Sequence, residues 1–73
     1  MTKLPRVSGQ NCVSALLKAG FRIKRQHGSH IILRRDHPFA QVVVPDHAEL
    51  DTGTLRAILR QASLSPDDFR ELL

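Results

Sequence analysis

The first apolar stripe of the chain repeats every three to four residues. It follows Ser8, a good N-cap residue, and stops before Gly20, which tolerates the positive φ found just after a helix. This spacing predicts a helix from about Gly9 to Ala19 with a buried stripe made of Cys12, Val13, Leu16 and Leu17.

From residue 21 the period changes to two, which is typical of a strand. Phe21 and Ile23 fall on one side of the strand 21–26, and the basic or polar residues on the other side are Arg22, Lys24 and Gln26. The next three residues, His27-Gly28-Ser29, predict a tight hairpin connection in which Gly28 supplies the unusual φ. We therefore expect the first strand to carry a wet, basic face.

The returning strand is predicted over His30–Arg35. Ile32 shares a face with His30, and Ile31 and Leu33 share the other, so both faces are apolar and the register stays open. A second turn is expected over 36–40, because it contains an interior proline, and a third strand over 41–44, where Pro45 stops it. Three short consecutive strands predict an antiparallel meander.

Two helices are predicted after a loop at 46–51. Asp51 or Thr52 can cap the first, whose stripe is Leu55, Ile58, Leu59 and Ala62. Ser65 and Pro66 open a short last helix that carries Phe69, Leu72 and Leu73. The fold class is thus α+β, a single domain over 1–73 in which two helices cover one face of a three-stranded antiparallel sheet and a short C-terminal helix follows. The other sheet face should be open.

Charge is distributed unevenly along the 73 residues. Residues 1–35 hold eight Lys and Arg and no acid, whereas residues 36–73 hold three Arg and seven acids, for a net charge of +4. A basic half favours a polyanionic partner, because phosphate contacts release counterions. It is equally typical of a surface that only keeps a small protein soluble.

Composition argues for an ordinary globular protein of the cytoplasm. No apolar run approaches the roughly 20 residues that cross a bilayer, and the first residues lack the apolar stretch of a signal peptide. Cys12 is the only cysteine, which excludes an internal disulfide and a CxxC-type zinc site, and we expect it to be a buried helix residue.

Histidine is the side chain best suited to proton transfer near neutral pH. His37 and His47 fall in loops, whereas His27 and His30 flank Gly28-Ser29 beside several cations. His27 and His30 lack the spacing of a helical zinc site, so we expect no metal. The chain also has no nucleophile elbow, which argues against a serine hydrolase.

Cleavage of RNA needs fewer protein groups than a metal site or a serine hydrolase, because the substrate supplies the 2′-hydroxyl as nucleophile. One acid or base and nearby cations can suffice, and a histidine among arginines meets that need. His30 could equally begin a strand and form only local hydrogen bonds. RNA binding without catalysis is the rival function; with few aromatic residues on the sheet, phosphate contacts by Arg22, Lys24, Arg25, Arg34 and Arg35 should dominate.

Several motifs together resemble the HicA toxins of toxin–antitoxin systems. The similarity covers nearly the whole chain and is carried by Ser8, Leu16–Phe21, Gly28-Ser29-His30, Val42–Pro45 with His47, and Gly53–Ala62. One departure is Ser63, which stands where family members often have a glycine that closes the helix.

The resemblance implies a fold like that of a double-stranded-RNA-binding domain and an mRNA interferase that needs no cofactor. It also implies that a HicB-type antitoxin covers the site, and that His30 is the catalytic residue, with Gly28 and Ser29 as its supporting motif. We expect a monomer when free and a hetero-oligomer with the antitoxin. For His47 both loop packing and substrate contact stay open.

Three functions remain to be separated: an RNA-cleaving toxin, a non-catalytic RNA-binding module of the same fold, and an interaction protein whose basic face serves only an acidic partner. The Gly28-Ser29-His30 motif favours the first.

Overall fold

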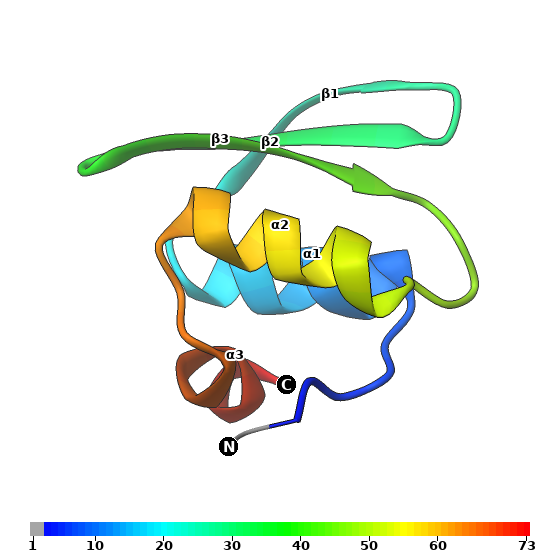
Figure 1. The fold of residues 1–73 in the computed structure, drawn as a ribbon. Helices are drawn as coiled ribbons and strands as arrows, with labels where there is room; N and C mark the ends of the chain where they lie inside the picture. Colours follow the sequence, from blue (N-terminus) through cyan, green and yellow to red (C-terminus); the bar gives the residue numbers. More distant parts are fainter. Residues whose placement is uncertain (1–2) are drawn as a thin grey trace.

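The computed structural model describes residues 3–73, which form six elements in the order α-β-β-β-α-α (Figure 1). This order confirms the α+β fold, like that of a double-stranded-RNA-binding domain. The elements are α1 (Gly9–Lys18), β1 (Arg22–His27), β2 (His30–Asp36), β3 (Phe39–Pro45), α2 (Thr52–Ala62) and α3 (Pro66–Leu72).

The three strands form one antiparallel sheet in the order β1-β2-β3, and the helices lie on one side of it (Figure 1). α1 and α2 pack against the sheet, while α3 packs against α1. Ile31 and Leu33 of β2 are buried toward the helices. His30, Ile32 and Arg34 alternate with them and therefore lie on the other face, which we call the open face. This settles the register that the sequence leaves open.

The core lies between the sheet and the helices and includes α3. Its largest fully buried side chains are Phe69, Leu16, Leu33, Leu55, Val42, Val44 and Cys12. Phe69 comes from α3, so the short terminal helix is part of the core. Cys12 is fully buried in α1, which confirms the prediction of a buried helix residue, and this burial raises the pKa of its thiol to about 11.

Side chains close the helix ends as their residue types predict. Ser8 accepts a hydrogen bond from the backbone N–H of Asn11 at 3.0 Å, and Asp51 accepts one from that of Thr54 at 2.7 Å. Ser63 ends α2 in the left-handed region, at φ 59°. The N–H of the next residue, Leu64, then donates to the Leu59 carbonyl at 2.9 Å, so a serine closes this helix in the way a glycine would.

Several strand boundaries differ from the sequence prediction by one or two residues. β1 covers Arg22–His27 rather than 21–26, β2 extends to Asp36, and β3 includes Pro45, which is predicted to stop it. β3 begins at Phe39 rather than Gln41, because Asp36 pairs with Phe39 and the turn is only two residues long. Pro38 sits in that turn, so its missing N–H costs the sheet no hydrogen bond. β1 continues to His27 and contains a bulge between Ile23 and Arg25.

Candidate active site

The hairpin between β1 and β2 brings two histidines together. His27 and His30 are direct cross-strand partners around the two-residue turn Gly28-Ser29, and both are exposed. Gly28 has φ 55°, the positive value that the first turn residue adopts in a type II′ turn. Partners opposite each other have Cβ atoms about 4.5–5.5 Å apart on one face of a sheet. The open face therefore ends in a pair of imidazoles.

The two-residue turn sets this pair, and a bulge in β1 then changes which residues of the strand share its face. Lys24 is the extra residue: Ile23 pairs with Leu33, and Arg25, not Lys24, pairs with the next residue of β2. In an unbroken two-residue alternation His27 would share the face of Ile23, toward the helices. The extra residue reverses the phase and turns Arg25 and His27 to the open face. Gln26 is exposed as predicted, but it pairs with Ile31, so the prediction that it shares a face with Arg22 is wrong.

The backbone next to His30 is held by the loop after β3, and that loop is held by the first turn of α1. The Asp46 N–H donates to the Ser29 carbonyl at 2.6 Å, and the Gly9 N–H donates to the His47 carbonyl at 2.9 Å. Gln10 adds a side-chain hydrogen bond to Asp46 at 3.0 Å. The first turn of α1 thus holds the loop after β3, and that loop holds the hairpin turn. His47 contributes to this packing through its backbone carbonyl, while its side chain is exposed.

Gly9 is required for this close approach. A Cβ atom at position 9 would collide with the carbonyl oxygen of Pro45 and lie 3.1 Å from the Cα of Asp46. Pro45 is in turn the β3 partner of His30. A glycine at the start of a helix is thereby linked, through one strand, to the position of the histidine.

The cations of the open face fall into two groups. Arg22 and Arg34 both bind the carboxylate of Asp36, at 2.8 and 3.0 Å. The hydrogen bond from Arg22 and the charges of both arginines hold the pKa of Asp36 below its usual value. Lys24 and Arg25 make no ion pair within residues 3–73. Arg25 lies two residues before His27 on the same face, about 7 Å along the strand, and is the cation closest to the histidine pair in the register.

Arg35 is separated from the other predicted RNA-binding residues. It pairs with buried Ala40 and so points to the helix side of the sheet. Its guanidinium lies 4.7 Å from the centre of the Phe21 ring and donates to the carbonyls of Pro38 at 3.0 Å and Ala62 at 3.2 Å. These contacts join β2 to the end of α2 and give Arg35 a structural role.

Phe39 is a residue whose exposure the sequence does not reveal. Its side chain is 64% exposed although it is one of the largest apolar groups in the chain. It pairs with Asp36 at the end of the open face away from His30, and the Arg34 guanidinium lies 5.2 Å from its ring centre. From the sequence it is only a turn residue after a proline.

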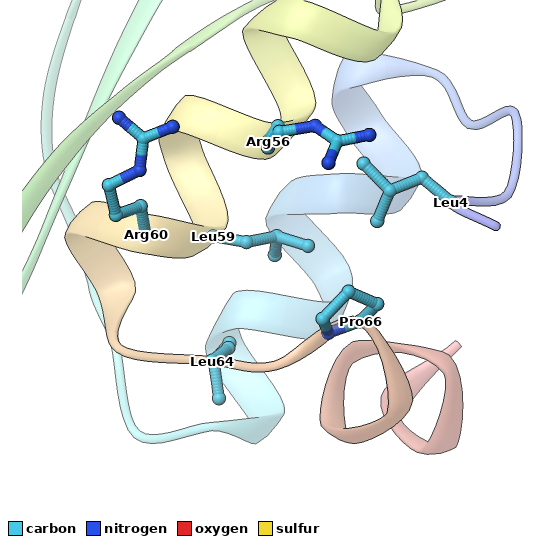
Figure 2. Close-up of a pocket in the computed structure, with 6 residues that line it drawn as sticks. All are labelled: Leu4, Arg56, Leu59, Arg60, Leu64 and Pro66. Atoms are coloured by element: carbon cyan, nitrogen blue, oxygen red, sulfur yellow. The ribbon is translucent and has the colours of Figure 1, made fainter. Parts of the chain in front are cut away.

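The pocket in Figure 2 lies elsewhere, between α2, α3 and the N-terminal segment. Two arginines of α2 stand beside its apolar wall, and it contains no histidine; its lining residues are Leu4, Arg56, Leu59, Arg60, Leu64 and Pro66. Within residues 3–73, no group of three or more His, Cys, Asp or Glu could hold a metal ion. No helix of that range is long and apolar enough to cross a membrane. The histidine pair and the cation Arg25 lie instead on the open face, which is the candidate site.

Most of the chain matches the model of one protein family. A family model described as the HicA toxin of bacterial toxin–antitoxin matches residues 9–64. The matched stretch begins with α1 and runs past the end of α2, so it contains the whole sheet and the hairpin with both histidines. No curated protein matches the chain significantly.

Proposed function

The chain belongs to the HicA toxin family of bacterial toxin–antitoxin systems, and from that premise we propose that it is an mRNA endoribonuclease that works without a metal cofactor. The proposal assigns His30 as a general acid or base. The observation that carries it is the pairing of His27 with His30 at one end of a basic, exposed sheet face. Two neighbouring proton-transfer groups can supply both an acid and a base for RNA cleavage by the neighbouring 2′-hydroxyl.

The chemistry divides the work between two imidazoles. One accepts the 2′-hydroxyl proton as the 2′-oxygen forms a bond to phosphorus, and the other donates a proton to the 5′-oxygen as its bond to phosphorus breaks. The products are a 2′,3′-cyclic phosphate and a free 5′-hydroxyl, so atoms and protons balance without an added reactant. We assign His30 one of these roles and His27 the other.

Residues next to the histidine pair also favour cleavage of the phosphodiester bond. Negative charge grows on the phosphate oxygens during attack, and the exposed guanidinium of Arg25 beside His27 can stabilise it. At Gly28 nothing lies within 4 Å of where a side chain would begin, which leaves the RNA backbone free to approach the turn.

A toxin of this family implies a cognate antitoxin. We propose that a HicB-type antitoxin covers the open face with an acidic surface, because complementary charge speeds capture of a dangerous enzyme. Reversing the charge of Arg25 should then slow association. A complex that left His30 accessible would contradict inhibition by direct occlusion.

The decisive experiment follows cleavage of a long RNA in excess EDTA across a range of pH. His30→Ala should lower the cleavage rate by at least about 100-fold, the usual contribution of general acid–base catalysis. His27→Ala should remove one limb of a bell-shaped pH–rate profile, because only one of the two proton transfers is lost. Growth arrest on expression should disappear with cleavage in the His30 variant.

His37→Ala is the matched control. His37 is an exposed histidine in the other turn, at the opposite end of β2, so its removal should leave both rate and pH profile unchanged. A folded His30→Ala protein that cleaves normally would refute the assignment. If the unaltered protein binds RNA and leaves it intact, the non-catalytic RNA-binding module replaces the proposed enzyme.

A further inference from the structure

We infer that Phe39 is a binding platform for a nucleobase of single-stranded RNA, placed at the end of the open face opposite the histidine pair. The inference rests on the proposed function, since it concerns the same RNA. It adds a subsite that reads an unpaired base.

The ring is positioned for stacking. Phe39 starts β3 as the partner of Asp36, which follows His30, Ile32 and Arg34 in the alternation of the open face. With 64% of the side chain exposed, the ring is largely accessible to a ligand. Stacking of a base on an exposed aromatic side chain is a common way in which proteins hold single strands.

Two neighbouring arginines make a base a better ligand than an apolar protein surface. Arg34 lies 5.2 Å from the ring centre, and both Arg34 and Arg22 are held by Asp36. An apolar partner covering the ring would also displace water from the charged groups of Arg22, Arg34 and Asp36 without offering hydrogen bonds in its place. A nucleotide supplies a base for the ring and a phosphate for the guanidiniums together.

The distance between the two ends of the face sets the path of the strand. Asp36 lies six residues after His30 along β2, which corresponds to about 20 Å. A base on Phe39 is therefore several nucleotides away from the phosphate cleaved at the histidine pair. A base-paired duplex keeps its bases stacked inside, so it cannot use this site.

The test is a binding titration with a fluorescein-labelled, single-stranded RNA of mixed sequence, in a His30→Ala background that keeps the RNA intact. Phe39→Ala should weaken binding between about 5-fold and about 150-fold, the effect of losing one stacked base. Phe39→Trp should retain binding, whereas Phe39→Leu, which keeps apolar bulk without a π face, should not. The dependence of affinity on salt should stay the same, because no phosphate contact is lost.

Two controls separate stacking from other causes. The same RNA annealed to its complement should bind both proteins equally, and thermal melting should be unchanged because Phe39 is exposed. Replacing single bases with abasic sites should reveal one position that matters to the parent protein and no longer matters to Phe39→Ala.

The outcomes also distinguish this inference from the proposed function. Binding of Phe39→Ala within twofold of the parent, or full retention by Phe39→Leu, would overturn the platform while leaving cleavage at His30 untouched. Absence of RNA binding by the unaltered protein would remove the proposed function itself.

Discussion

Replacing Arg35 with alanine should destabilise the fold and leave RNA binding almost intact. The sequence places Arg35 beside Arg34 in one basic run, yet the strand sends the two side chains to opposite faces. Arg35 stacks on Phe21 and donates to two backbone carbonyls, those of Pro38 and Ala62. Alanine removes all three contacts and leaves the carbonyl that ends α2 without its side-chain donor.

The size of the effect follows from these contacts. A hydrogen bond from a charged donor contributes about 1.5–3 kcal/mol when desolvated, and a stacked cation about 0.5–1 kcal/mol at exposed sites. Because Arg35 is only half-buried and its bond to Pro38 is exposed, we expect a total loss of about 1–3 kcal/mol in the free energy of unfolding. For a domain of this length each kcal/mol corresponds to about 4–8 °C in Tm.

Thermal melting and RNA titration of the same samples check both halves of the prediction. Arg35→Ala should melt lower and bind RNA within about twofold of the parent, with the same salt slope. Arg25→Ala should do the opposite, losing about 0.7 from the slope of log affinity against log salt for each single-strand phosphate contact. Arg56→Ala, an exposed arginine of α2 outside the sheet, should change neither. An Arg35→Ala protein that melts normally and binds RNA weakly would refute the reasoning.

Other substitutions test the role of Asp36 as counter-charge to the arginines and the close packing of Gly9 against the loop after β3. Asp36→Asn should release Arg22 and Arg34 and so strengthen RNA binding with a steeper salt slope, measured by the same titration. The pKa of Asp36 is lowered in the folded protein, so its ion pairs should persist below the pH at which an ordinary aspartate becomes protonated. Their contribution to stability should disappear as the pH falls through that lowered pKa, which an NMR titration of the carboxyl measures. Gly9→Ala should lower the free energy of unfolding by about 1–3 kcal/mol in urea denaturation, because the added methyl group meets backbone. Gly53→Ala, whose new Cβ atom would have only an ordinary contact at 3.5 Å, should not destabilise, and equal losses at the two glycines would contradict the argument.

Elements with a clear period were predictable from the sequence. The stripes of α1 and α2 and the caps at Ser8 and Asp51 are local features, and the structure has them where the pattern predicts. The exception is Leu17, predicted in the buried stripe of α1 but 45% exposed. The turn at Gly28-Ser29 was equally predictable, because a glycine there satisfies a local demand on φ. The family resemblance, which the comparison confirms, rests on the same local motifs.

Properties that depend on register were not predictable. A bulge is set by how one strand fits its neighbour, so the alternation in β1 could not reveal that Lys24 is an extra residue or that Arg25 shares a face with His27. The role of Arg35 depends on α2, which lies far along the chain. Gly9 looks like an ordinary helix residue until the loop after β3 is seen against it.

The bulge also affects how the sheet meets other chains. Both β1 and β3 are edge strands, and edge strands can recruit further strands and seed aggregation. The extra residue Lys24 distorts the β1 edge and places charge on it. The β3 edge is bracketed by Pro38 and Pro45, which have no N–H to offer an incoming strand. The bulge that shifts the alternation of β1 thus also helps to keep this small sheet from adding further strands.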